Sequence, residues 1–211
     1  STSQNPAAFA VTTASAGIYT LTATNACGAT SATTTAVTIN TVPSAVSATA
    51  TPNTLCSGTN LTLTSAATSS TGAVTYAWSG PNGFTSTSQN PAAFAVTTAS
   101  AGIYTLTATN ACGATSATTT AVTVNEVPSA VSATATPNTL CSGANLTLTS
   151  AATSSTGAVT YAWSGPNGFT STSQNPAAFA VTTESAGIYT LTATNACGEI
   201  AATTTAVTVN V

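Results

Sequence analysis

The stretch AGIYTLTATNACG, residues 101–113, alternates apolar with hydroxyl-bearing side chains. Tyr104, Leu106 and Ala108 share one parity, and threonines occupy the positions between them. Successive side chains of a β-strand point to opposite faces, so this pattern predicts a strand with one buried face. At its two ends the stretch has small-residue turn sequences that contain glycine, Ala101-Gly102 and Ala111-Cys112-Gly113. The stretch therefore predicts one half-buried strand between two tight turns.

Three further stretches show the same two-residue period: NLTLTSA (60–66), VTYAW (74–78) and TTTAVTVN (118–125). β-branched residues are abundant in them, and turn sequences separate them at roughly 8–12-residue spacing. This predicts an all-β fold of half-buried antiparallel strands arranged as a β-sandwich. The expected strands of one repeat are 45–51, 60–66, 74–79, 84–88, 92–97, 103–110 and 116–125.

The chain repeats itself every 85 residues. Residues 1–85 and 86–170 differ at three positions, and a third copy begins at residue 171. A period of this length corresponds to one small domain per repeat. The strand order sets the frame: residues 42–125 and 126–211 each form a complete domain, and residues 1–41 are the C-terminal half of one. We expect tandem domains in a linear array.

Each complete domain carries a Trp on its third expected strand, Trp78 or Trp163, and a Tyr opening its sixth, Tyr104 or Tyr189. Both features are marks of immunoglobulin-like sandwiches. The parity of Trp78 with Tyr76 favours a place in the core between the sheets. The other interpretation is an exposed aromatic platform that stacks on a sugar.

The composition excludes several functions. Among the 211 residues there is no Lys, Arg, His, Asp or Met, and only Glu126, Glu184 and Glu199 carry charged side chains. A nucleic-acid partner requires Lys or Arg to neutralise phosphates. Acid–base catalysis and metal binding require clustered titratable ligands, so we expect no enzyme, metal or cofactor. No apolar run approaches the roughly 18 residues that span a bilayer, so this segment is not expected to insert into a membrane.

A family resemblance rests on CSG, YAWSGPNGF, AGIYT and NACG, which recur along the entire chain. With these motifs the sequence resembles the immunoglobulin-like or PKD-like modules repeated in giant cell-surface proteins of the Bacteroidota. The resemblance implies an extracellular stalk of adhesin type on a bacterial surface, exported by type IX secretion. The near-absence of charge departs from most such modules and suggests a specialised surface.

The five cysteines occupy two repeated positions. TLCSG carries Cys56 and Cys141, and NACG carries Cys27, Cys112 and Cys197. Their recurrence beside Gly and Ser, with no His and no CxxC motif, indicates disulfides and an oxidising compartment.

Two pairings remain open, and free thiols are the third alternative. The TLCSG and NACG positions of one domain lie at opposite ends of the expected sandwich, roughly 20–26 Å apart at about 3.3 Å per strand residue. Bridged Cα atoms lie only about 4.4–6.8 Å apart. One hypothesis therefore bonds Cys56 to Cys197 across a domain junction, and Cys112 and Cys141 then pair with neighbours outside this segment. The other bonds Cys56 to Cys112 and Cys141 to Cys197 within domains, if the strand topology differs. Cys27 finds its partner outside the segment under either scheme.

These observations predict a disulfide-stabilised structural segment of a stalk or filament. Its expected partners are neighbouring repeats of the same chain, together with self-association into a fibre. The alternative is a surface module that binds a glycan, or ice through its rows of outward threonines. Sandwich strands twist, which disfavours a flat ice-binding face.

Overall fold

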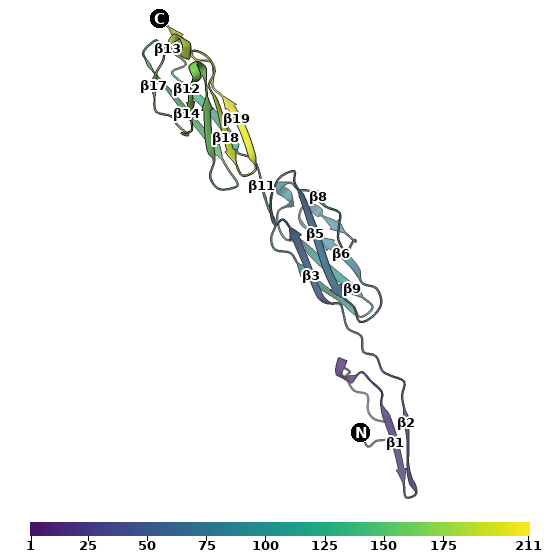
Figure 1. Ribbon diagram of the computed structural model, residues 1–211. Coiled ribbons are helices and arrows are strands. Elements are labelled where there is room, and N and C mark those ends of the chain that lie inside the picture. Colours follow the sequence, from purple (N-terminus) through teal and green to yellow (C-terminus); the bar gives the residue numbers. More distant parts are fainter. The chain divides into compact units, whose positions relative to one another are not determined.

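The computed structural model describes residues 1–211, which form short β-strands and single-turn 3₁₀ helices (Figure 1). Residues 1–41 contain β1 (Thr20–Asn25) and β2 (Gly28–Thr33). The strands of the first complete repeat are β3 (Ser44–Thr51), β4 (Thr54–Cys56), β5 (Asn60–Thr68), β6 (Thr75–Ser79), β7 (Thr85–Ser86), β8 (Phe94–Ala95), β9 (Thr105–Asn110), β10 (Gly113–Thr118) and β11 (Thr123–Asn125). Those of the second are β12 (Ser129–Thr136), β13 (Thr139–Cys141), β14 (Asn145–Thr153), β15 (Thr160–Ser164), β16 (Thr170–Ser171), β17 (Phe179–Ala180), β18 (Thr190–Asn195), β19 (Gly198–Thr203) and β20 (Thr208–Asn210).

The helices lie at repeated positions in the loops: η1 (Thr13–Ser15), η2 (Pro81–Gly83), η3 (Thr98–Ser100), η4 (Pro166–Gly168) and η5 (Thr183–Ser185). None of them has the length or the apolar character needed to cross a membrane. The all-β prediction is confirmed.

Residue contacts divide the chain into two compact units. The first comprises Ser1–Thr49, Leu63–Pro91 and Ile103–Thr120. The second comprises Ala50–Thr62, Ala92–Gly102 and Ala121–Val211, and so contains the whole of the second complete repeat.

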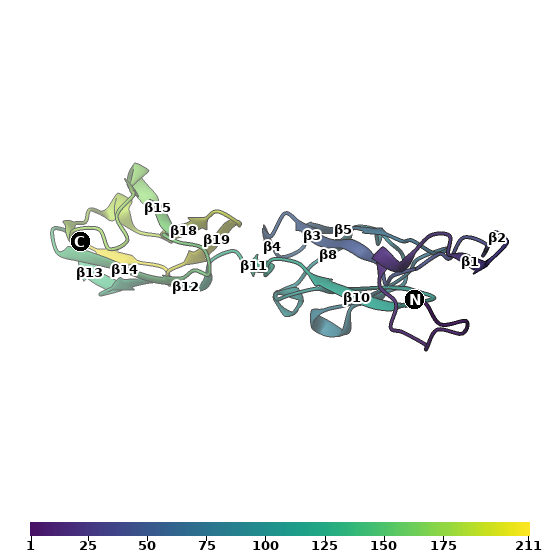
Figure 2. The same ribbon diagram turned by 90° about the horizontal axis from the view of Figure 1, so that it is seen from below.

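The second complete repeat is a two-layered sandwich. One sheet has the strand order β16-β15-β18-β19, and the other has the order β12-β14-β17. Figure 2 shows β15, β18 and β19 in one layer and β12 and β14 in the other. All neighbours within these two sheets are antiparallel. A separate ribbon pairs β13 with β20 in parallel.

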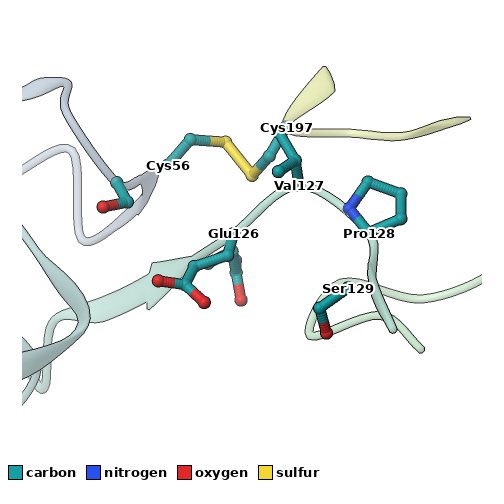
Figure 3. A pocket seen from close by; sticks show the side chains of 8 residues that line it. Cys56, Glu126, Val127, Pro128, Ser129 and Cys197 are labelled. Atoms are coloured by element: carbon teal, nitrogen blue, oxygen red, sulfur yellow. A yellow bond between two sulfur atoms is a disulfide. The ribbon is translucent and has the colours of Figure 1, made fainter. Parts of the chain in front are cut away.

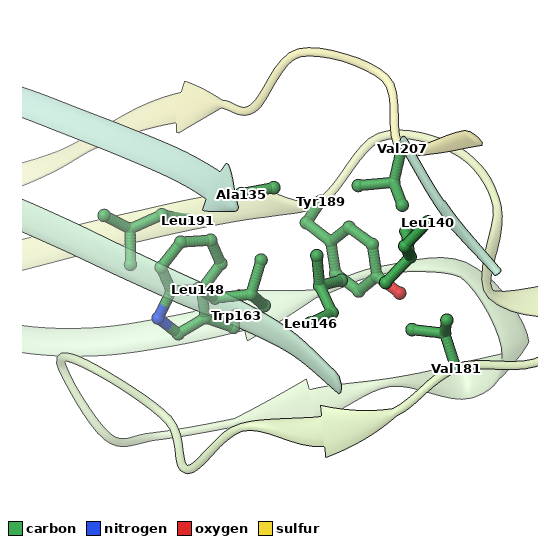
Figure 4. Close-up of a cluster of buried hydrophobic side chains, with 9 residues drawn as sticks. All are labelled: Ala135, Leu140, Leu146, Leu148, Trp163, Val181, Tyr189, Leu191 and Val207. Carbon is green, nitrogen blue, oxygen red and sulfur yellow. The ribbon is translucent and has the colours of Figure 1, made fainter. Parts of the chain in front are cut away.

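The core of this sandwich lies between the two layers (Figure 4). Tyr189, Leu146 and Leu191 are fully buried, and Trp163 is 2% exposed. The ring of Phe169 packs edge-on against that of Tyr189 with centroids 5.4 Å apart. Burying each large apolar side chain contributes about 1.5–3 kcal/mol to stability.

The polar ends of the two core aromatics have hydrogen-bond partners. Trp163 Nε1 donates to the carbonyl of Gln174 (3.2 Å), and the Tyr189 hydroxyl donates to the carbonyl of Ser185 (3.0 Å). The Tyr189 ring also requires Gly165, because a Cβ there would overlap the ring carbons. Close approach of backbone to ring therefore explains a glycine in the YAWSGPNGF motif.

The first unit contains the corresponding four-stranded sheet, β10-β9-β6-β7. Trp78 Nε1 donates to the carbonyl of Gln89 (3.1 Å), and Phe84 packs edge-on against Tyr104 with centroids 5.4 Å apart. Tyr104, Leu106 and Ala108 are fully buried, as their shared parity predicts.

Residues 1–41 form a hairpin in which β1 pairs with β2. Leu21, which is equivalent to the buried Leu106, is 57% exposed, and Tyr19 is 41% exposed. The reason is that this segment holds the sequence equivalents of β8 to β11 but not those of β3 to β6, which cover these side chains in a complete repeat.

The prediction of one continuous antiparallel strand over residues 116–125 is wrong. It is divided into β10, which pairs with β9, and β11, which pairs in parallel with β4. The break has a local cause. Thr119 is buried, its N–H donates to the Tyr104 carbonyl (2.9 Å), and its Oγ1 accepts the Tyr104 N–H (3.1 Å). The short strands β4 and β13 were not predicted at all.

Candidate functional site: a disulfide at the repeat junction

The first half of the site is the TLCSG segment that carries Cys56. Its strand β4 lies beside β11, with Cys56 opposite Asn125. The Ser57 N–H donates to the Asn125 carbonyl (2.8 Å), and the Thr59 hydroxyl donates to the Cys56 carbonyl (2.6 Å). Parallel pairing with the last strand of the repeat therefore places Cys56 beside the start of the linker.

The second half is the NACG turn between β18 and β19. The Asn195 Oδ1 accepts the N–H of Cys197 (2.8 Å), which is the local turn that Asn favours. Gly198 follows with φ +137°, a conformation that L side chains rarely adopt. A Cβ there would also lie 3.1 Å from Val127 Cγ1. The turn is thus shaped to present one cysteine while its backbone lies against the linker.

A disulfide bond joins these halves. Cys56 and Cys197 are bonded, with Cα atoms 5.5 Å apart. Both residues belong to the second unit. In sequence, however, they come from successive 85-residue repeats, 141 positions apart. Figure 3 shows the bond beside the linker residues Glu126, Val127 and Pro128.

A cleft next to the bond is lined by Cys56, Ser57, Asn125, Glu126, Val127, Pro128, Ser129 and Cys197. Glu126 supplies the one carboxylate of this lining, and the other lining side chains are small or apolar apart from Asn125 and the serines. What the arrangement forms is a covalent cross-link between Cys56 and Cys197.

The other three cysteines, Cys27, Cys112 and Cys141, are free and exposed. The intradomain bonds Cys56–Cys112 and Cys141–Cys197 are not present. The reason is visible in the second repeat: Cys141 lies opposite Asn210 near the C-terminus, whereas Cys197 lies in the β18–β19 turn at the other end of the sandwich (Figure 1). The six residues of β18 lie between these ends.

The four aromatic markers, Trp78, Trp163, Tyr104 and Tyr189, lie in the cores and are at most 2% exposed. Burial raises the pKa of the Tyr104 and Tyr189 phenols, because the charged form would lose hydration. Buried indole rings cannot stack on a sugar, so a glycan-binding platform cannot be built on Trp78 or Trp163.

Outward hydroxyls are partly used within the sheets. Thr107 Oγ1 and Ser116 Oγ are 3.0 Å apart across β9 and β10, and Ser129 Oγ lies 2.7 Å from Thr153 Oγ1. Such cross-strand pairs stabilise a sheet by about 0.2–1 kcal/mol each.

One functional residue escaped the sequence analysis. The Asn195 side chain, besides holding the cysteine turn, donates from Nδ2 to the Glu126 carbonyl (2.8 Å) and to Ser154 Oγ (3.1 Å). Asn110 makes the same contacts in the first unit, to the Thr41 carbonyl (2.8 Å) and Ser69 Oγ (3.1 Å). The available signal was an Asn two positions before every NACG cysteine.

Comparison with known protein families gives one match. A family described as PKD-like domain matches residues 42–122 and 127–207. No curated protein matches the chain.

Solved structures with a similar fold include two fragments of titin. The I-band fragment I67–I69 is 18% identical, with a TM-score of 0.53, and the match covers 80% of this chain and 66% of the fragment. A three-domain I67–I69 variant is 17% identical, with a TM-score of 0.52, covering 95% of this chain and 77% of the variant. The chain thus spans just under two thirds of the first fragment. At these identities the likeness shows a shared tandem immunoglobulin-like fold and nothing about function.

Proposed function

The chain belongs to the PKD-like domain family, and from that premise we propose that it is a structural segment of an extracellular, repetitive cell-surface protein of adhesin type. Tandem immunoglobulin-like domains serve widely as spacers, and a disulfide suits an oxidising, extracellular compartment. The absence of Lys and Arg removes every cleavage site for proteases that cut after basic residues. Export by type IX secretion to a bacterial surface is part of this proposal and rests on the family resemblance of the motifs.

One observation carries the proposal: the bond between Cys56 and Cys197 links residues of successive repeats. A tensile force applied to the chain would pass through this bond. The 141 positions between the two cysteines would then be shielded from extension even if their folds were lost. A cross-link between successive repeats limits how far the chain can be extended, which suits a spacer under load.

In an array of many repeats, the spacing of the bonded cysteines would limit how far the whole chain can be extended. The 141-residue loop is longer than the 85-residue period, so bonds formed at every repeat would define overlapping loops. The shortest covalent path would then run through only the 29 positions from a NACG cysteine to the next TLCSG cysteine, as from Cys112 to Cys141, once in every two periods. At about 3.6 Å per residue this limits extension to roughly 100 Å for two repeats, or roughly 50 Å per repeat, against roughly 300 Å per repeat without bonds. We propose a stalk of limited extensibility as the mechanism.

Single-molecule stretching of residues 1–211, held at both termini, tests this function. The reduced chain should extend about 50 nm further than the oxidised chain, because 141 more residues become extensible at about 3.6 Å each. Cys197→Ser should behave like the reduced chain under both conditions. Equal extension of the oxidised and reduced chains would refute the mechanical role.

Surface location needs a separate measurement. Antibodies against the repeat should label intact cells of the source bacterium without permeabilisation. Labelling that appears only after lysis would contradict the proposed location while leaving the mechanical result unaffected.

A further inference from the structure

We propose that Asn195 is a positioning residue that selects the Cys56–Cys197 pairing among the five cysteines. It does so by holding the linker and the cysteine turn in one hydrogen-bonded frame. The inference concerns how the bond forms, and it holds whether or not the chain serves as a stalk.

The first step is that both ends of the Asn195 amide are used. Oδ1 accepts the N–H of Cys197 (2.8 Å) and fixes the turn that presents its thiol. Nδ2 donates to the carbonyl of Glu126 (2.8 Å) and fixes the same turn to the linker. One side chain therefore sets the position of Cys197 relative to the linker.

The second step is that Asn125, the last residue of β11 and the one before the linker, is held by the residue after Cys56. The Ser57 N–H donates to the carbonyl of Asn125 (2.8 Å). The consecutive carbonyls of Asn125 and Glu126 thus accept hydrogen bonds from Ser57, next to Cys56, and from Asn195, two residues before Cys197. The path from Cys56 through Ser57, Asn125, Glu126 and Asn195 to Cys197 contains two hydrogen bonds and few residues, whereas the chain between the two cysteines covers 141 positions.

The third step is that the linker backbone is also held on the side of the second repeat. The Glu126 N–H donates to Ser155 Oγ (2.9 Å), and Pro128 is fully buried. Only backbone atoms of Glu126 take part, and Thr41 uses the same backbone groups at the equivalent position. This explains how Thr and Glu can both occupy that position.

Bond formation then needs only an oxidant. With glutathione disulfide, one protein thiolate attacks the glutathione disulfide and releases one glutathione. The second protein thiolate then attacks the mixed disulfide and releases another. One S–S bond forms and one breaks, and two electrons pass to glutathione. The frame around Asn195 raises the effective concentration of the second thiol.

The first unit supplies a matched control. Asn110 makes equivalent bonds to the Thr41 carbonyl, Ser69 Oγ and the Cys112 N–H (2.9 Å). Cys112, however, has no bonded partner in this chain. Asn110→Ala therefore removes the same hydrogen bonds without touching the frame between Cys56 and Cys197.

The experiment is a glutathione redox titration of residues 1–211, with the pairing read by Glu-specific digestion and mass spectrometry. Cleavage after Glu126, Glu184 and Glu199 separates the cysteines into peptides 1–126, 127–184 and 185–199. The Cys56–Cys197 bond links the first to the third, and a Cys141–Cys197 bond would link the second to the third. These two pairings therefore differ in mass, and fragmentation of the linked peptides identifies which of Cys27, Cys56 and Cys112 in the first peptide is bonded.

Asn195→Ala should lower the effective concentration for the Cys56–Cys197 bond by roughly two- to tenfold, the factor for one net hydrogen bond. It should also increase the fraction of other pairings. Asn195→Asp keeps the acceptor for Cys197 but loses the donor to Glu126, so it should show the same loss, and Asn110→Ala should match the parent chain.

Far-ultraviolet circular dichroism of each reduced variant establishes that the sandwich is folded. If Asn195→Ala does not fold, Asn195→Asp and Ser154→Ala decide, because Ser154→Ala removes only the hydroxyl partner and should leave the pairing intact. An effective concentration in Asn195→Asp equal to that of Asn110→Ala would overturn the proposal.

Discussion

Cys56 and Cys197 have Cα atoms 5.5 Å apart although 141 positions separate them in the chain. In the chain-entropy description, a loop of this length stabilises the folded state by at most about 5 kcal/mol. We therefore expect Cys56→Ser and Cys197→Ser to lower the thermal midpoint equally, and the double variant to lower it no further. Calorimetry would measure this.

The free cysteines give the control for that experiment. Cys112→Ser and Cys141→Ser should leave the midpoint unchanged, because both thiols are exposed and unbonded. A midpoint in Cys141→Ser as low as that in Cys197→Ser would contradict the observed pairing.

Gly165→Ala should destabilise the second repeat, because the new Cβ would overlap the ring of the fully buried Tyr189. Overpacking of a core typically costs about 1–3 kcal/mol. Gly157→Ala is the comparison: its site is open, and only its φ of +54° opposes the change. Urea titration followed by tryptophan fluorescence should show the larger loss at position 165, and an equal loss at both would show that the ring can move aside.

Tyr189 should make stability fall at high pH. Burial raises its pKa in the folded state above the ordinary value of about 10. The unfolded chain therefore releases the proton first, so the contribution is fully present below about pH 10 and is lost as the pH rises above it. Urea midpoints at pH 8 to 11 should show the fall, and Tyr189→Phe should make it shallower. An unchanged pH dependence in Tyr189→Phe would disprove the assignment.

The same Tyr189→Phe variant carries a second cost at neutral pH. It removes the 3.0 Å hydrogen bond to the Ser185 carbonyl in a buried place. A net loss of about 0.5–1.5 kcal/mol is expected at pH 7. Comparing its urea midpoint at pH 7 with that of the parent chain measures this term separately from the ionisation.

Stability should be insensitive to ionic strength. The chain has three carboxylate side chains and no basic side chain, so no pair of side chains can form a salt bridge. Screening acts only on such charge interactions. Thermal midpoints in 10 and 500 mM sodium chloride should therefore agree within about 1 °C. A marked dependence would indicate charge interactions at Glu126, Glu184 or Glu199 that the fold does not show.

Local alternation was enough to predict the buried face of each strand. Tyr104, Leu106 and Ala108 are buried because side chains two apart share a face, and this geometry depends on nothing beyond the strand itself. The 85-residue period, likewise visible in the sequence alone, gave the repetition of the sandwich.

Contacts between distant segments needed the tertiary structure. The parallel pairing of β4 with β11 and the break at Thr119 leave no alternating pattern in the sequence, and the recurring Asn of NACG does not by itself name Glu126 as the partner of Asn195. The cysteine partners belong with these features. The sequence determined that NACG and TLCSG recur at fixed positions, but only the fold decided that Cys56 meets Cys197, because proximity in space depends on where the strands end.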